Sequence, residues 1–512
     1  MLAALVVYYT LPVLASRRRR DIPGPFLATF TNFWLFYQCR RKKRSLAVEL
    51  AHKKYGKFVR IQPNHISIAA VDAIQAIYGH GNGFLKSDYY DAFAGPKHRS
   101  IFNTRDRDEH SRKRRAVSHI FSAKSVGQFE QYICNNIRIF VGKWNGLCDR
   151  QQTEVEATYA QIDALPWFSY LSFDIIGDLA FGAPFGMLSS EDDLADACKT
   201  VDAAPTCVAA IEVLNRQGEV SATLGCYPQL KPFSKYFPDT FFQYGVEAID
   251  NMAGIAIERV KRRLNPDVLT KNTRVDMLAK LMESRDEHGD KLSRDELITE
   301  SLTFLVAGSN TTAVTLCSVL YFVVSTPGVL ERLQGAIDEA VSPGADIPSF
   351  DMVKHVSYLQ WVIWETFRVH SAFSLGLPRQ IPKGNAPVDI CEQTFYPGDV
   401  LSVPTYTLHH STDIWGPDAE AFIPERWDPT TRLTTHQKDA FMPFGVGPRA
   451  CIGRNLAEME LKCIVAAVFR NFEFKLEQDI RMDYREGFIR KPSSLKWVEA
   501  SWDKHGSAYQ KL

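Results

Sequence analysis

One cysteine near the C-terminus stands in a setting that favours a thiolate. Cys451 lies in a glycine-rich loop, directly before an amphipathic run, residues 455–461, that is typical of a helix. A thiolate there gains from the dipole of the helix N-terminus and from unpaired backbone N–H groups. Gly447 and Gly453 let the backbone approach a flat cofactor, and Arg449 can contact an anionic edge of it. We therefore expect Cys451 to bind a flat cofactor that carries negative charge.

A second chemical feature lies inside the longest predicted helix. Ser293 and Glu296 have the spacing of a capping box, and the apolar run that follows continues to about Val324. Its middle carries the small and hydroxyl residues 307–312, which let a helix bulge and open a groove for oxygen and water. Small residues also serve helix–helix contacts, so this segment alone leaves both interpretations open.

A third feature combines an acid with two arginines. Glu365 and Arg368 lie on one face of the helix predicted over residues 358–370. Such a pair on a surface contributes less than about 1 kcal/mol, but apolar residues flank this one, which predicts burial. Because buried ions need several partners, we expect Arg426 to be the third member of a structural ion cluster.

The elements that must position these residues change along the chain. Short alternating stretches at residues 57–61 and 65–68 predict strands, residues 128–332 are mainly helical, and residues 379–403 are strand-like again. Strands at both ends of a helical middle do not split into separate folding units. We therefore predict one large catalytic domain over residues 28–512, mainly α with small β-sheets.

The pattern from Phe444 to Gly453, Phe-x-x-Gly-x-Arg-x-Cys-x-Gly, resembles the haem-ligand loop of the cytochromes P-450. The resemblance covers nearly the whole chain from Asp21 onward and implies the P-450 fold. It implies haem b as the cofactor, with the Cys451 thiolate as axial ligand of the iron and with Phe444 and Gly453 at the haem. It also implies that four side chains bind the haem carboxylates: His110, Arg114, Arg379 and Arg449.

The same resemblance assigns residues 307–312 to oxygen activation, with Thr311 as the hydroxyl that guides protons. The commonest pattern of the family has an acid directly before this threonine. This chain has Asn310 there, which forms hydrogen bonds but does not titrate. We therefore expect proton delivery at this catalytic pair to rely more on ordered water and on Thr311.

Four further segments resemble the fungal benzoate para-hydroxylases of this superfamily: residues 102–106, 173–182, 212–216 and 414–418. This implies hydroxylation of a small aromatic acid, benzoate to 4-hydroxybenzoate, with O₂ and with NADPH electrons delivered by cytochrome P-450 reductase. The alternative is a monooxygenase of a fungal secondary-metabolite pathway, acting on another aromatic or polyketide-like substrate. A thiolate-haem isomerase or dehydratase and a haem sensor are disfavoured because Thr311 and the basic run are retained.

The basic run, Arg112, Lys113 and Arg115, is expected to belong to a positive surface that docks the acidic reductase. We expect five residues to form walls of the substrate pocket: Tyr90, Phe93, Phe304, Ala307 and Leu375. No residue in the sequence stands out as the group that holds a substrate carboxylate.

Bulk composition excludes several other classes of protein. The 512-residue chain is 45% hydrophobic, enough for a large core, and its net charge of +1 argues against nucleic acid as a partner. The ten cysteines are scattered without a Cys-x-x-Cys pair, which argues against a disulfide framework and a zinc site. This usage suits a reducing compartment.

The N-terminus differs from the rest. Residues 2–15 are almost wholly apolar and are followed by four arginines and a proline-rich segment. As a helix these residues span about 21 Å, short of a hydrocarbon core of about 30 Å. A secretory signal peptide is the alternative, but arginines on the C-terminal side favour a cytosolic flank. We predict a membrane anchor at residues 1–16, a hinge at residues 17–27, and a catalytic domain on the cytosolic face of the endoplasmic reticulum.

Overall fold

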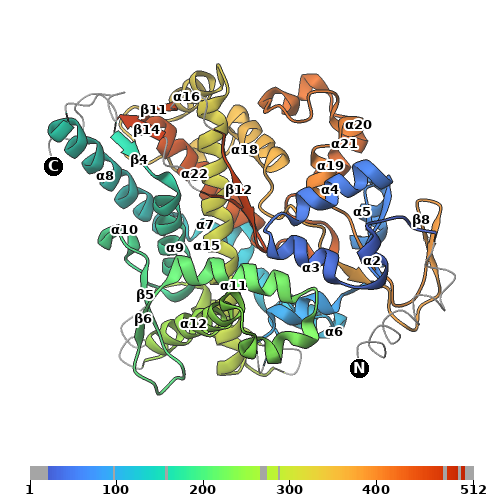
Figure 1. Cartoon of the computed structure of the whole chain (residues 1–512). Coiled ribbons are helices and arrows are strands. Elements are labelled where there is room, and N and C mark those ends of the chain that lie inside the picture. The colour runs from blue at the N-terminus through green and yellow to red at the C-terminus, as the bar shows by residue number, and fades with distance from the viewer. Residues whose placement is uncertain are drawn as a thin grey trace.

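The helix predicted to carry the small-residue segment is the axis of the fold. In the computed structural model, which describes residues 21–95, 98–155, 160–265, 274–285, 289–476, 481–493 and 498–501, helix α15 (Arg294–Ser325) runs through the middle of the molecule (Figure 1). It begins with the predicted capping box, in which Ser293 accepts from the Glu296 N–H and the Glu296 side chain accepts from the Ser293 N–H. Within the described residues α15 alone is long and apolar enough to cross a membrane, but 61% of its apolar window is buried inside the protein.

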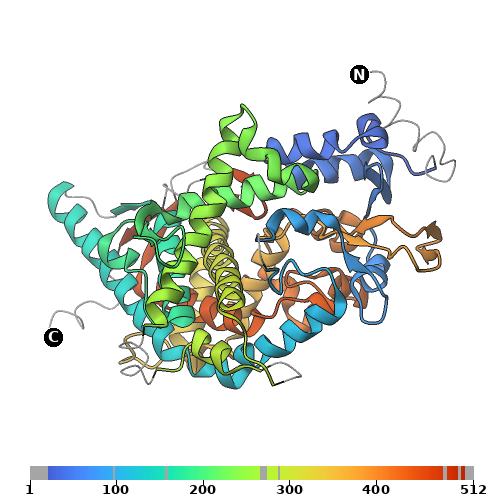
Figure 2. The same cartoon turned by 90° about the horizontal axis from the view of Figure 1, so that it is seen from below.

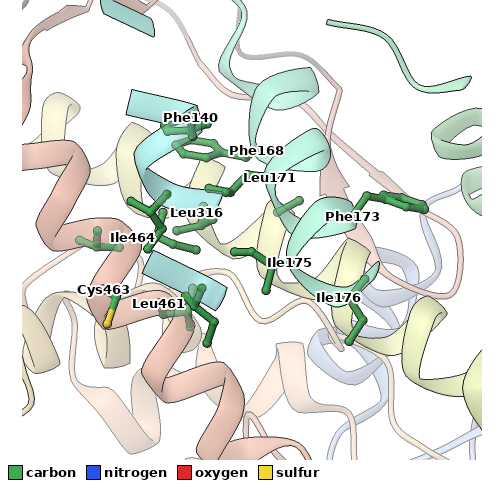
Figure 3. Close-up of a cluster of buried hydrophobic side chains, with 14 of the residues drawn as sticks. Phe140, Phe168, Leu171, Phe173, Ile175, Ile176, Leu316, Leu461, Cys463 and Ile464 are labelled. Atoms are coloured by element: carbon green, nitrogen blue, oxygen red, sulfur yellow. The ribbon is translucent and has the colours of Figure 1, made fainter. Parts of the chain in front are cut away.

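Helices around α15 form the main core. Helices α9 (Ala164–Phe181), α12 (Thr240–Arg263), α18 (Ser357–Val369) and α22 (Arg454–Asn471) pack against α15, and α8 (Glu130–Val155) packs against α9 and α22. Side chains from α8, α9, α15 and α22, among them Phe140, Leu171, Leu316 and Ile464, point toward one another (Figure 3). Each such fully buried side chain contributes about 1.5–3 kcal/mol of hydrophobic stabilisation. This packing holds the α15 backbone against α22, the helix that follows Cys451.

A five-stranded sheet lies on the other side of α15 from α8 and α9 (Figure 1). Its spatial order is β1 (Phe58–Gln62), β2 (His65–Ile68), β10 (Val400–Ser402), β7 (Arg379–Gln380) and β3 (Leu85–Lys86). The pair β2–β10 is parallel and the other pairs are antiparallel. The two strand-like regions of the sequence therefore meet in one sheet, which agrees with the prediction of a mainly α fold with small sheets.

Further elements complete the layers around this frame (Figure 2). The remaining helices are α2 (Phe26–Phe30), α3 (Phe33–Arg40), α4 (Arg44–Tyr55), α5 (Asp72–Tyr78), η2 (Asp88–Phe93), α6 (Arg107–Ser118), η3 (His119–Phe121), α7 (Ala123–Gly127), α10 (Met187–Ser190), α11 (Ala210–Leu224), η4 (Pro228–Tyr236), α14 (Met277–Glu283), α16 (Val329–Ala340), α17 (Phe350–Val353), α19 (Thr405–His409), α20 (Thr412–Trp415), η5 (Pro424–Trp427), η6 (Pro429–Thr431), α21 (Thr435–Ala440) and η7 (Gly447–Arg449). The remaining strands are β4 (Ala160–Ile162), β5 (Leu194–Ala197), β6 (Thr206–Ala209), β8 (Val388–Ile390), β9 (Gln393–Phe395), β11 (Glu473–Leu476), β12 (Tyr484–Glu486), β13 (Arg490–Pro492) and β14 (Val498–Ser501).

The structure differs from the sequence prediction in the middle of α15. Helix α15 is continuous through residues 307–312 and shows no bulge there. The reason lies in the hydroxyl groups, which donate to carbonyls one turn earlier: Ser309 to Leu305, Thr311 to Ala307, and Thr315 to Thr311. These bonds satisfy the hydroxyl groups and leave the backbone hydrogen bonds of the helix in place.

Candidate active site

Backbone hydrogen bonds and a glycine fix the loop that carries Cys451. The Cys451 N–H donates to the carbonyl of Phe444 over 2.8 Å, which closes the loop. Gly447 has a φ of +72°, and a Cβ on it would stand 1.9 Å from the carbonyl oxygen of Tyr78. No other residue fits at Gly447, because both the dihedral and the close approach require glycine.

The thiol of Cys451 faces a space inside the protein. The residue is accessible to solvent, yet burial raises the pKa of its thiol, while the Gly453 N–H and the charge of Arg114 lower it. Solvent reaches the Cys451 side chain although the residue lies deep in the protein, so Cys451 borders an internal space. Gly453 has an ordinary φ of −82°, and a Cβ there would meet only the Cys451 sulfur and the Phe121 ring, both at 4.0 Å. The chain therefore leaves room beside the sulfur.

The protein alone does not make Cys451 a thiolate. Burial is the strongest influence on its pKa and opposes the backbone N–H group and the arginine. The N–H group of Gly453, just before α22, lowers the pKa of the thiol but does not outweigh burial. A bound metal cation would deprotonate the thiol outright.

The four residues expected at the haem carboxylates converge on one place. Burial lowers the pKa of His110 to about 3, and the positive charges of Arg449, Lys86, Arg114 and Arg379 lower it further. His110 is therefore a neutral N–H donor surrounded by cations. Burial and the charge of Arg379 also lower the pKa of Arg449, to about 10.

These cations bond to neutral groups of the protein. Arg114 donates to the carbonyl of Ala450 over 3.0 Å, Arg449 to that of Thr104 over 2.7 Å, and Arg379 to the hydroxyl of Tyr90 over 3.0 Å. None of the ion pairs found among the described residues includes one of these arginines. Buried cations of like sign destabilise one another unless an anion joins them. A haem, with two carboxylates, fits this donor set and the space beside the Cys451 sulfur.

The accessible face of α15 borders the same region. Phe304 packs edge-on against Phe121 at 5.2 Å, and the carbonyl of Phe121 accepts from Asn455 just beyond the cysteine loop. Ala307 and Thr311 lie one and two turns after Phe304, on the same helix face, and Ala307 is exposed although it belongs to the central helix. The Thr311 hydroxyl donates to the carbonyl of Ala307 over 2.6 Å. Asn310, beside it, is half-buried.

The residues expected to wall a substrate pocket fall into different surroundings. Tyr90 is fully buried and holds Arg379, so it belongs with the cations. Leu375 is also buried and lines a cavity of about 10 Å³ with Arg44 and Ser374, room for about one water. Phe93 packs against Phe488 at a ring distance of 4.6 Å.

An aromatic cluster around Phe93 was not expected from the sequence. Phe488, in the turn between β12 and β13, contacts the rings of Phe93, Phe102 and Phe373 at 4.6, 5.5 and 5.2 Å. These rings come from three regions far apart in the chain. No local pattern in the sequence could have grouped them.

The ion cluster is formed as the spacing indicates. Arg368 holds Glu365 through two hydrogen bonds of 2.7 and 3.0 Å, and Arg426 donates to the same carboxylate over 3.2 Å. Glu365 and Arg368 are fully buried. Arg368 also donates to the carbonyls of His409, Ala419 and Ala421. The cluster therefore ties α18 to the irregular segment that leads into the cysteine loop.

One member of the basic run on α6 does not lie at the surface expected of it, whereas Arg115 is exposed. Lys113 is buried, with an exposed side-chain fraction of 3%, and its amine lies 3.4 Å from the carboxylate of Glu300. Arg112 pairs with Glu296 over 2.9 Å. The expectation is wrong for Lys113, because both acids reach it from α15, nearly two hundred residues away in the chain.

Comparison with known proteins agrees with this geometry. The family model of cytochrome P450 matches residues 23–498. The chain belongs to the cytochrome P450 family. This P450 is 61% identical to the benzoate 4-monooxygenase of Aspergillus niger over 495 residues, 97% of this chain and 95% of that protein. A cytochrome P450 monooxygenase of Aspergillus oryzae is 32% identical over 468 residues, 89% and 86% of the two chains. The pisatin demethylase of Fusarium vanettenii is 29% identical over 462 residues, 89% and 85%.

Proposed function

We propose that this P450 monooxygenase hydroxylates benzoate to 4-hydroxybenzoate. The observation that carries the proposal is the 61% identity to a benzoate 4-monooxygenase along almost the entire chain. The alternative, a secondary-metabolite monooxygenase acting on another aromatic or polyketide-like compound, is supported only by relatives of about half that identity. It is not favoured.

In this proposal haem b binds between the α15 face and the cysteine loop. When bound, the haem supplies the chemistry that activates O₂ and inserts one of its oxygen atoms into the aromatic ring. The Cys451 sulfur would hold the haem iron, and a thiolate ligand would supply electron density for that chemistry. His110, Arg114, Arg379 and Arg449 would hold the haem carboxylates, because the positive charges of the three arginines gather around His110.

Thr311 and Asn310 handle protons on the other side of the site. The Thr311 hydroxyl has one proton, engaged with the Ala307 carbonyl, and its lone pairs can accept from an ordered water. A rotation of this hydroxyl redirects the proton into the accessible space. Asn310 holds a water by hydrogen bonds but supplies no proton of its own. Proton delivery therefore runs through water to the Thr311 oxygen.

The proposed partners are the membrane and a flavoprotein, NADPH–cytochrome P-450 reductase. The proposed anchor, residues 1–16, lies outside the described residues. Support for a membrane comes from exposed aromatic side chains on α2 and η4, with Phe26 76% and Tyr236 73% exposed. The ion pair between Arg40, at the end of α3, and Asp239, just after η4, joins α3 to the segment that follows η4. Such an aromatic surface suits the interface of a membrane, and we place the domain on the cytosolic face of the endoplasmic reticulum.

The test uses the full-length protein reconstituted with purified reductase and NADPH. We expect benzoate to be converted to 4-hydroxybenzoate carrying one labelled atom from ¹⁸O₂, detected by mass spectrometry. Cys451→Ser should lose the absorbance of the CO-treated reduced protein that is typical of a thiolate-ligated haem. If benzoate neither shifts the haem spectrum nor is hydroxylated, while another aromatic compound is, the secondary-metabolite alternative replaces the proposal.

A further inference from the structure

Two buried cysteines from distant parts of the chain lie in contact between α3 and the turn that follows α11. Cys39 belongs to α3, and its sulfur is 3.8 Å from that of Cys226, which lies 187 residues further along the chain. The exposed fractions of the two residues are 5% and 2%, and both thiols are free. A disulfide bond is about 2.05 Å long, so the sulfurs must approach by about 1.8 Å, which rotation of the two side chains can supply.

The backbone around this cysteine pair is held on both sides. Asn32, at the start of α3, donates from its side chain to the carbonyl of Cys226 over 2.8 Å, which fastens the turn after α11 to α3. On the other side of the turn, Gly225 packs so closely against Tyr89 that a Cβ on the glycine would stand 2.4 Å from the tyrosine ring. The two sulfurs therefore stay neighbours, and a bond between them requires little movement of the main chain.

The surroundings make one of the two sulfurs the better nucleophile. The Cys226 thiol donates to the Cys39 sulfur, and the buried guanidinium of Arg44 places a positive charge beside it. These two effects lower the pKa of Cys39, although burial and the charge of Glu486 oppose them. The hydrogen bond to Cys39 and burial raise the pKa of Cys226. A sulfur that favours the thiolate beside one that keeps its proton suits an attacking and a resolving cysteine.

We propose that Cys39 and Cys226 are a redox-sensitive pair, which hydrogen peroxide converts to a disulfide that fastens α11 to α3. The Cys39 thiolate attacks one oxygen of the peroxide, the O–O bond breaks, and a sulfenic acid and hydroxide result. The hydroxide takes up the proton that Cys39 released. The Cys226 sulfur then attacks the Cys39 sulfur, the S–S bond forms, and the sulfenic hydroxyl leaves with the Cys226 proton as water. Over both steps, two thiols and one hydrogen peroxide give one disulfide and two water molecules.

The disulfide is expected to be transient. In a reducing compartment, which the cysteine usage of this chain suits, disulfides are as a rule transient and redox-sensing. A small dithiol reverses the bond by thiol–disulfide exchange and is itself oxidised to a disulfide.

The helix that the disulfide fastens lies over the aromatic cluster around Phe93. A Cβ on Gly218 of α11 would stand 3.8 Å from that of Phe488, and Val220 of α11 belongs to a buried cluster against which Phe93 packs. Reduction of O₂ by two electrons without oxygen insertion gives hydrogen peroxide, so a monooxygenase is itself a source of the oxidant. Peroxide from such wasted turnover would therefore tighten the cover of the aromatic cluster. This inference goes beyond the proposed function and does not depend on benzoate as the substrate.

The test treats the full-length, haem-containing protein with hydrogen peroxide, alkylates the remaining thiols and digests the protein without a reductant. We expect mass spectrometry to find the peptides of Cys39 and Cys226 joined, and to find them separate after treatment with dithiothreitol. Cys39→Ser and Cys226→Ser should each abolish the joined species. Cys134→Ser is the matched control, because Cys134 shares a thiol hydrogen bond with Cys463, in a second cysteine pair that Glu130 disfavours as a thiolate. This control should leave the joined species intact.

Hydrogen–deuterium exchange then measures whether the bond restrains α11. The amides of α11 should exchange about tenfold more slowly in the oxidised wild-type protein than in the reduced one, because the bond restricts the open states of the chain. Peroxide should leave this exchange rate unchanged in Cys226→Ser. The proposal is overturned if no joined species forms, if Cys134→Ser abolishes it, or if α11 exchanges equally fast in the oxidised and reduced wild-type protein.

Discussion

The hydroxyl of Thr312 donates a 3.0 Å hydrogen bond to the carboxyl group of Glu460, which joins the central helix α15 to helix α22. Thr312 directly follows the proposed proton-handling pair, and Glu460 lies on the helix that begins just after Cys451. The contact therefore holds the two halves of the site at a fixed separation. Burial raises the pKa of Glu460 to about 8, so its carboxyl group is protonated at neutral pH.

This carboxyl group should make the stability of the protein depend on pH. The unfolded state has the ordinary pKa of 4.5, so the folded state binds the extra proton between pH 4.5 and about 8. Stability is then lost as the pH rises through this window, by on the order of 2–4 kcal/mol. Glu460→Gln should remove most of this loss, with a higher melting temperature than wild type at pH 8 and a similar one at pH 5. A Glu460→Gln variant with the pH dependence of the wild type would contradict the assignment.

The buried ion cluster should be essential to the fold. Glu365→Gln leaves Arg368 charged and without its carboxylate, which costs about 3–5 kcal/mol. We expect a large loss of folded, haem-containing protein, measured by urea unfolding and by the ratio of haem to protein. Arg138→Gln is the control, because its ion pair with Asp346 is exposed and should contribute less than about 1 kcal/mol.

Two glycines of the cysteine loop should respond differently to alanine. At Gly447 an added Cβ meets the Tyr78 carbonyl at 1.9 Å and φ is positive, so Gly447→Ala should destabilise even the haem-free protein. At Gly453 the chain leaves room, so Gly453→Ala should keep the haem-free stability and lower only the haem content. Melting of the two haem-free variants, followed by haem titration, separates the cases. Equal loss of haem-free stability in both would show that Gly453 has a role in the scaffold itself.

Thr311 and Asn310, in the proposed oxygen-activation segment, should differ in their effect on coupling, which is the yield of product per NADPH consumed. Thr311→Ala removes the hydroxyl that passes the proton and should lower the yield of product per NADPH several-fold, by about 10-fold at most, with hydrogen peroxide as the by-product. Asn310→Asp adds a titratable group and should keep or raise this yield. The measurement is product and peroxide formed per NADPH consumed. A large fall for Asn310→Asp would mean that the amide has a specific role.

Local signals in the sequence predicted the local features of this fold well. The capping box at Ser293 and the pairing of Glu365 with Arg368 depend on residues three positions apart, and both are present. The continuous helix at residues 307–312 was not foreseen, since a hydroxyl can either open a helix or bond back to it. The burial of Lys113 depends on acids of α15, which no charge pattern within α6 reveals.

The remaining parts of the site depend on contacts between distant segments. Lys86 has nothing in its own segment that marks it, and its place opposite Arg379 appears only when β3 pairs with β7. The same holds for Phe488, whose neighbours in space lie more than one hundred residues away in the chain. Sequence motifs therefore predicted a cofactor role for Cys451 and for four basic residues that the fold brings together, whereas the position of Lys86 among them depends on the pairing of distant strands.

The order of strands in that sheet also constrains how the protein is made. Strands β1, β2 and β3 emerge from the ribosome early, but β10 and β7, which lie between β2 and β3, follow some three hundred residues later. Strands β2 and β3 cannot complete the sheet until β7 and β10 have been translated. Pairings between strands so far apart in the chain also form slowly. A nascent chain released before residue 400 therefore lacks both the finished sheet and the cysteine. We therefore expect the cofactor to bind late, after translation is complete.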